Sequence, residues 1–198
     1  VNGLCVYVLG DYTLGKPMRI TSLCSKSGSE IINIERTSKL SGKIHTKGIM
    51  ILTSIIKSFT SMKKIKGLSI SVCFEQSYNE VDGDSSMSAE LTAVISSISK
   101  VPIKQNLAIT GSLNQLGDIQ PVGGINEKIE GFYSVAKKLR KHNDCHVIIP
   151  HQNIQNLMLS KEIQDAVNKK WLKIWPTKKY SEVFHIATGV SLSTLKIP

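Results

Sequence analysis

Short motifs for nucleotide and metal binding are missing from this chain of 198 residues. It has no G-x-x-x-x-G-K-[ST] phosphate loop; the segment at 10–16, Gly-Asp-Tyr-Thr-Leu-Gly-Lys, comes near it, but Pro17 follows the lysine where Ser or Thr is needed. The five histidines are scattered, and no H-E-x-x-H motif brings two onto one helical face. We therefore expect neither bound ATP nor a metal or other cofactor in this chain.

Cysteines are few and far apart. Cys5, Cys24, Cys73 and Cys145 form no C-x-x-C pair, and we expect free thiols in a reducing cytoplasm. His146 next to Cys145 suggests a cysteine nucleophile, but adjacent residues on a strand point to opposite faces, which argues against such a pair.

Long apolar runs are also absent. No stretch approaches the roughly 18 to 20 apolar residues that span a bilayer, and no basic-then-apolar signal segment opens the chain. We expect no membrane association and a cytoplasmic location. Because the first residue is Val1 and not a methionine, we also expect a piece of a longer protein.

The composition suits one domain over residues 1–198, since 41% apolar residues can bury one substantial core; two small domains are the alternative. The net charge is +10, and basic residues cluster at Lys63-Lys64-Lys66, Lys137-Lys138-Arg140-Lys141, Lys169-Lys170 and Lys178-Lys179. Such a charge can attract nucleic acid, but few aromatic residues adjoin the clusters as stacking partners. We favour solvated faces and keep nucleic-acid binding as a secondary possibility.

Hydrophobic periodicity predicts strands that dominate the first third of the chain and helices that come later. The expected strands are 4–9, 18–23, 30–34, 68–74, 107–110, 147–149 and 172–175, with helices at 46–59, 86–100, 125–140, 153–168 and 181–188. Turns are expected at Ser27-Gly28-Ser29 and across 10–16. This order predicts an α+β fold with mixed α/β layers, in which a strand-rich N-terminal part is followed by helices packed on small sheets.

A serine precedes one of these helices in Val81-Asp82-Gly83-Asp84-Ser85-Ser86-Met87-Ser88. The helix is indicated by an apolar stripe at Met87, Leu91, Val94, Ile95 and Ile98. Ser85 would then lie near its first turn, where unpaired N–H groups and the helix dipole can hold an oxyanion. The simpler interpretation is that Ser85 or Ser86 only caps the helix.

A lysine stands on the apolar side of another expected helix. Lys128 lies three residues after Ile125 and four before Phe132, so its helical neighbours are apolar. Burial would lower the pKa of the Lys128 amine, and only the neutral amine can take a proton from a serine hydroxyl. The alternative is a lysine whose ammonium group reaches back to water.

From about 68 to 129 the chain resembles the proteolytic domain of Lon-type ATP-dependent proteases. The resemblance is carried by Asp82-Gly83-Asp84-Ser85, Leu107-Ala108-Ile109-Thr110-Gly111 and Pro121-Val122-Gly123-Gly124 with Glu127-Lys128. Phe74-Glu75-Gln76-Ser77-Tyr78 looks most like the gamma-proteobacterial Lon homologues that are not the housekeeping enzyme.

The resemblance implies that Ser85 is the nucleophile, Lys128 the general base and later acid, and Thr110 the residue that orients the lysine. Backbone N–H groups near Asp84 and Ser85 are candidates for the oxyanion hole, and Gly83 supplies backbone freedom.

Two acidic residues precede the serine, and one histidine stands out elsewhere in the chain. Asp82 or Asp84 could hold an inactive state by pairing with Lys128, since a carboxylate nearby favours the ammonium. His45 lies in a segment that resembles the family and precedes a helix; a surface or interface histidine is the favoured interpretation.

The resemblance implies a serine endopeptidase that cleaves unfolded proteins, normally coupled to an ATPase portion with ATP and Mg upstream and assembled as a hexameric ring. The alternatives are a non-catalytic Lon-like assembly or binding module and a basic nucleic-acid-binding domain.

Overall fold

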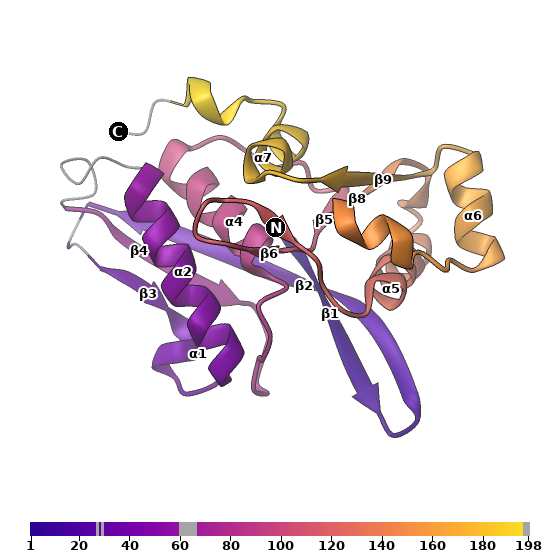
Figure 1. The fold of residues 1–198 in the computed structure, drawn as a ribbon, viewed down its shortest axis with the longest axis horizontal. Helices are drawn as coiled ribbons and strands as arrows, with labels where there is room; N and C mark the ends of the chain where they lie inside the picture. Colours follow the sequence, from indigo (N-terminus) through magenta and orange to yellow (C-terminus); the bar gives the residue numbers. More distant parts are fainter. Residues whose placement is uncertain (27, 29, 60–66, 196–198) are drawn as a thin grey trace.

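The computed structural model describes residues 1–26, 28, 30–59 and 67–195, which form layers of helices around a mixed sheet (Figure 1). The N-terminal part contains β1 (Asn2–Leu9), β2 (Tyr12–Ser25), β3 (Ile31–Asn33), α1 (Ile34–Thr37), α2 (Lys43–Phe59) and β4 (Ser69–Phe74). The middle contains α4 (Met87–Ser99), β5 (Leu107–Ile109), β6 (Ser112–Leu113), β7 (Ile119–Gln120) and α5 (Ile125–Lys138). The last part contains β8 (Cys145–Pro150), α6 (Lys161–Asn168), β9 (Leu172–Thr177) and α7 (Tyr180–Thr188), with short 3₁₀ turns at His142–Asp144, His151–Asn156 and Leu192–Thr194.

Among the described residues, seven strands form one sheet in the order β3-β4-β2-β1-β5-β8-β9, and β6 and β7 form a separate ribbon. The β1–β2 and β2–β4 pairs are antiparallel, whereas β3–β4, β1–β5, β5–β8 and β8–β9 are parallel. The expected α+β fold with mixed layers is confirmed. That residues 1–198 make up one domain stays a prediction.

The two faces of the sheet are covered by different helices, because successive strand residues point to opposite faces. Leu107, Ile109 and Ile148 join a core with α2, α4 and α7, whereas Ala108 and Val147 join a core with α5 and α6. Helices α4 and α5 therefore lie on opposite faces of the sheet. Their N-termini come together at the end of β5, which is where open parallel sheets place ligand sites.

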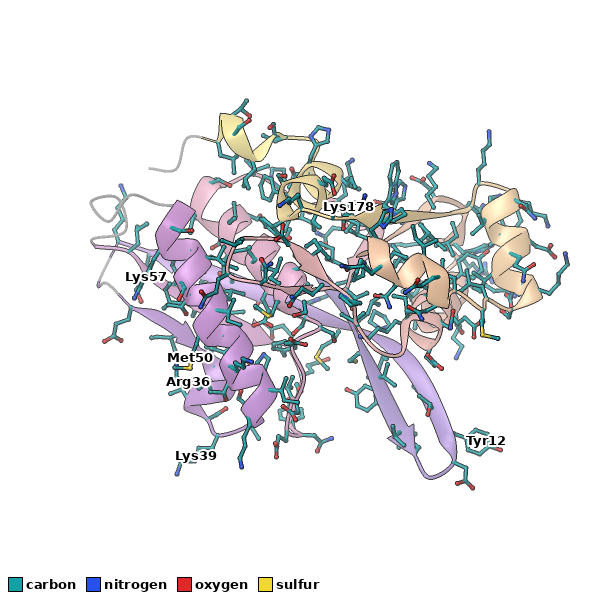
Figure 2. The ribbon with its side chains drawn as sticks, in the orientation of Figure 1. Tyr12, Arg36, Lys39, Met50, Lys57 and Lys178 are labelled. Atoms are coloured by element: carbon teal, nitrogen blue, oxygen red, sulfur yellow. The ribbon has the colours of Figure 1, made fainter. Side chains whose placement is uncertain are left out.

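The end of the hairpin of β1 and β2 extends away from the rest of the molecule (Figure 1), while the rest of both strands lies inside the sheet. Its strands pair continuously from Asn2 with Arg19 to Leu9 with Tyr12, so the turn is only Gly10-Asp11. The expected turn across 10–16 is therefore wrong for residues 12–16. Tyr12 lies at the tip, pointing into solvent (Figure 2), with 79% of its surface exposed.

The expected helix over 153–168 is also wrong in part. The chain forms a 3₁₀ turn at His151–Asn156, breaks, and begins α6 at Lys161. The break is stabilised from α5, since Asn126 accepts a hydrogen bond from the Met158 N–H and Glu130 accepts one from the Ser160 N–H. These tertiary partners replace the intrahelical bonds that the periodicity had predicted.

Smaller differences also have local causes. Strand β3 stops at Asn33 instead of residue 34, because the Asn33 side chain accepts from the Arg36 N–H and caps α1. Helix α2 begins at Lys43 instead of residue 46. The expected turn at Ser27-Gly28-Ser29 and the basic cluster at Lys63-Lys64-Lys66 lie outside the described residues, apart from Gly28.

Candidate active site

Ser85 lies two residues before α4, at the end of the sheet. Its backbone carbonyl accepts hydrogen bonds from the Gly111 N–H (2.8 Å) and from the Thr110 hydroxyl (3.2 Å), both just after β5. Gly83 has φ +92°, a conformation that favours glycine and agrees with the backbone freedom expected there. Neither Ser85 nor Ser86 caps α4 through its side chain. Ser86 does stand at the N-cap position of α4, as the capping interpretation allows, but its hydroxyl donates to Glu90 instead of accepting from a helix N–H.

Lys128 lies in the first turn of α5 and is buried, with 3% of its surface exposed. The helix presses directly on β2 at Gly15: a Cβ on Gly15 would lie 1.9 Å from the carbonyl oxygen of Glu127. A Cβ on Gly131 would lie equally close to the carbonyl oxygen of Gly15. These two glycines allow the backbone of α5 to approach the strand, which brings Lys128 close to Ser85 and away from water.

The side chains of Lys128 and Ser85 meet beyond the end of β5. Lys128 Nζ donates a hydrogen bond to Ser85 Oγ at 3.0 Å, within the range for proton transfer between a base and a nucleophile. Burial lowers the pKa of Lys128 to about 8, although Cys5, Asp84 and Glu127 act in the opposite direction. Roughly a tenth of the lysine side chains would then be neutral at pH 7.

Thr110 lies directly after β5 and is buried. Its hydroxyl donates to the carbonyl of Ser85, so it holds the backbone of the serine that faces the lysine. The role in orienting Lys128 that the resemblance implies stays a prediction.

The backbone around the serine offers free donors. Within the described part of the chain, the N–H groups of Asp84, Ser85 and Ser86 have no hydrogen-bond acceptor, whereas Met87 donates to the Asp84 carbonyl and Ser88 to the Gly111 carbonyl. Unsatisfied N–H groups beside a nucleophile can stabilise an oxyanion, so these groups are suitable donors for the expected oxyanion hole. The oxyanion hole itself stays a prediction.

The two acidic residues before the serine have different surroundings. The Asp82 carboxylate accepts from the N–H groups of Ile44 (3.1 Å) and His45 (3.3 Å), which starts α2 three residues earlier than expected. Asp84 accepts from the Ser112 hydroxyl at 2.7 Å, and its charge raises the pKa of Lys128. In this structure neither carboxylate forms an ion pair with Lys128; their pairing in an inactive state stays a hypothesis.

Ser85 and Lys128 open onto a cleft of about 920 Å³. One wall is the β1–β2 hairpin with Cys5, Val6 and Thr13, and another is the loop 121–124 that leads into α5. Asn153 fixes this loop by exchanging two hydrogen bonds with the backbone of Val122, both 2.9 Å long. No sequence motif marks Asn153, because its pairing depends on two segments 31 residues apart.

The prediction for His45 is wrong. The side chain is fully buried and lies next to Glu90, at 3.3 Å from Nε2 to Oε1. The sequence around His45 predicts an exposed loop, because the partner that buries its imidazole, Glu90, lies 45 residues away.

All four cysteines are free; Cys145 is buried and the others are half-buried. The Cys145 thiol donates to the Lys141 carbonyl, while His146 contacts Asp144 and Trp175, so these neighbours form no dyad. In the described ranges, no group of three or more His, Cys, Asp or Glu side chains could hold a metal ion, and no helix has the length and apolar character to cross a membrane.

A serine hydroxyl that meets a buried lysine amine in an open cleft is an arrangement used by serine peptidases without a catalytic histidine. The model of one peptidase family, the Lon protease (S16) C-terminal proteolytic domain, matches residues 22–189 of the chain. The chain therefore belongs to this family of serine peptidase domains.

Among curated proteins, a putative Lon protease homolog of Escherichia coli K12 is 44% identical over 177 residues, or 88% of this chain and 30% of that protein. A putative Lon protease homolog of Haemophilus influenzae is 35% identical, over 97% of the chain and 32% of its own length. The archaeal Lon protease of Archaeoglobus fulgidus is 32% identical, over 92% of the chain and 27% of that protein. The chain thus spans about a third or less of the length of these relatives.

Proposed function

We propose that this chain is an endopeptidase in which Ser85 and Lys128 form a catalytic dyad. The observation that carries the proposal is the 3.0 Å hydrogen bond between Ser85 Oγ and the Nζ of a lysine that is 3% exposed. A lysine in that position can lose its proton near neutral pH, which is the property that a general base requires.

The reaction begins when neutral Lys128 takes the Ser85 hydroxyl proton while Oγ attacks the carbonyl carbon of a peptide bond. The negative charge that develops on the carbonyl oxygen is stabilised by the N–H groups of Asp84 and Ser85. Protonated Lys128 then gives its proton to the leaving amine, and an acyl-enzyme with an ester bond to Ser85 remains. Water activated by the same amine hydrolyses the ester and restores both groups.

The shape of the cleft supports polypeptide substrates. It is open, and it is lined by the β1–β2 hairpin on one side and by the loop 121–124 on the other. An extended segment can lie between them and bring its backbone to Ser85, whereas the backbone of a folded domain is covered by its own side chains. We therefore propose unfolded or unstructured polypeptides as substrates.

Coupling to an ATPase portion, a hexameric ring and a cytoplasmic location are further parts of the proposal. They are supported by membership of the family and by the relatives' greater length. ATP and Mg would act through that other portion, because this chain has no phosphate loop.

The test uses a fluorophosphonate that phosphonylates activated serines. The natural polypeptide that carries this sequence is treated with the reagent, and the labelled residue is identified by peptide mass spectrometry. The proposal predicts a label on Ser85, and a much slower reaction in Lys128→Ala. A label at full rate in Lys128→Ala, or none on Ser85 in a protein that hydrolyses peptides, would contradict it.

A further inference from the structure

A buried pair of ionisable side chains lies directly behind the catalytic segment Asp82-Gly83-Asp84-Ser85-Ser86. His45 from α2 and Glu90 from α4 are both fully buried, and His45 Nε2 lies 3.3 Å from Glu90 Oε1. The other ring nitrogen, Nδ1, lies 2.9 Å from the Ser41 hydroxyl. Neither residue touches the cleft, so the proposed reaction does not use them directly.

His45 is joined to both ends of the catalytic segment. At the first end, its backbone N–H donates to the Asp82 carboxylate at 3.3 Å. At the other end, the Ser86 hydroxyl donates at 2.7 Å to Glu90 Oε1, the same oxygen that faces the imidazole. Ser85 lies between these two attachments, and its own carbonyl is held from β5.

The acidic groups around His45 favour its pairing with Glu90. Buried carboxylates require a positive or hydrogen-bonding partner, and three acidic groups face His45 from different elements: Glu90 on α4, Glu35 on α1 and Asp82 on the catalytic segment. Burial lowers the pKa of His45, but the hydrogen bond to Glu90 and the three charges raise it more, so the net shift is upward. The second carboxylate oxygen of Glu90 has no hydrogen-bond partner, which leaves His45 and Ser86 as the groups that satisfy this side chain.

We propose that His45 is a positioning residue for the reaction: its side chain, through Glu90 and Ser86, fixes the end of the catalytic segment so that Ser85 Oγ stays within reach of Lys128. The hydrogen bond to Asp82 comes from the backbone of residue 45 and is kept in any side-chain variant. This inference rests on the proposed Ser85–Lys128 mechanism. A displacement of the nucleophile should lower kcat and leave substrate binding in the cleft unchanged, because His45 lies outside the cleft.

The test compares two amides at position 45. His45→Gln places an amide nitrogen near the position of Nε2 and can still donate to Glu90, whereas His45→Asn reaches Ser41 but is too short for Glu90. Glu35→Gln is the matched control, because Glu35 also faces His45 from a buried position but holds the Phe74 N–H instead of the catalytic segment. The variants are made in the natural polypeptide, and kcat, KM and Tm are measured with a fluorogenic peptide.

We expect His45→Asn to lower kcat roughly ten- to 100-fold with KM nearly unchanged, a loss typical of a misplaced reacting group. His45→Gln should recover most of kcat, and Glu35→Gln should lower Tm without lowering kcat. Equal kcat in the Asn and Gln variants, or a loss shared by Glu35→Gln, would overturn the inference. Activity that persists in Ser85→Ala would instead reject the proposed function, so the two failures are distinguishable.

Discussion

At the residue scale, the central feature is a lysine that the fold buries at a cost in stability. Taking an ammonium group out of water disfavours its charged form, and the structure offers Lys128 no carboxylate partner at ion-pair distance among the described residues. The same burial brings its pKa to about 8, close to neutral pH. The burial of Lys128 thus lowers the stability of the fold and supplies the neutral amine that the proposed chemistry needs.

Replacing the lysine should therefore stabilise the protein. The folded-state pKa of about 8 lies below the ordinary 10.5, so the penalty is fully present below pH 8 and disappears as the pH rises through 10.5. We expect Lys128→Met to raise the free energy of unfolding at pH 7 by about 1 to 3 kcal/mol while peptide hydrolysis is lost. Thermal melts of both proteins at pH 7 and pH 10 check this, because the difference should shrink at the higher pH.

Asp84 should affect the pKa of Lys128. Its charge raises the pKa of Lys128, so Asp84→Asn should move the midpoint of the pH–rate profile to lower pH. Asp82→Asn is the comparison: it weakens the start of α2, costing about 1 kcal/mol, but should leave the midpoint in place. Identical midpoints and rates in wild type and both variants would remove any electrostatic role for these residues, including the hypothetical inactive pair with Lys128.

At the scale of elements, the strands and helices that meet at the site could largely be predicted from hydrophobic periodicity. The stripe of α4 and the apolar neighbours of Lys128 on α5 place both helices correctly, because these helices bury one face. The contacts between elements could not be predicted. The sequence predicts a turn at Gly15, yet this residue pairs with Val6 inside β2, and the backbone of α5 occupies the space of its missing side chain.

The close approach of α5 to β2 gives a prediction at this scale. Gly15→Ala forces the helix away from the strand, since the new Cβ would overlap the Glu127 carbonyl. We expect a loss of about 1 to 3 kcal/mol in stability and a fall in kcat as Lys128 moves away from Ser85. Gly10→Ala is the control in the same hairpin: its Cβ meets nothing within 4 Å, so it should cost only the strain of its φ of +60°. Equal kcat values in the two variants would show that the helix position is unimportant.

At the scale of the whole molecule, the site joins segments from both faces of the sheet. Ser85 comes from the side of α4, Lys128 from the side of α5, and Thr110 from the end of β5 between them. The family resemblance could match all three residues from sequence motifs, but not the buried His45 and Glu90 behind them, because no local pattern marks a pair 45 residues apart. The basic residues are partly paired: Lys137 contacts Glu162, and Lys179 contacts Asp118. This pairing agrees with solvated faces better than with a nucleic-acid surface.

The stability of the molecule should depend on pH through His45. Its pKa is raised in the folded state, so the stabilisation by its charged form is complete below about pH 6.5 and is lost as the pH rises through the folded-state pKa. His45→Gln removes this titration. The difference in Tm between wild type and His45→Gln should thus be largest near pH 6 and smaller near pH 9. A difference that does not change between these pH values would mean that His45 is neutral in the folded protein.

The most direct test of the account is the rate of hydrolysis of a quenched, unstructured protein substrate between about pH 6 and 10, a range that brackets a lysine pKa lowered by burial. The natural polypeptide, Ser85→Ala and Lys128→Ala are compared under identical conditions. The dyad predicts a rate that rises with pH to a plateau, with a midpoint near the lowered pKa of about 8, and no activity in either variant. Activity that survives Ser85→Ala, or that survives Lys128→Ala with the same pH midpoint, would contradict it.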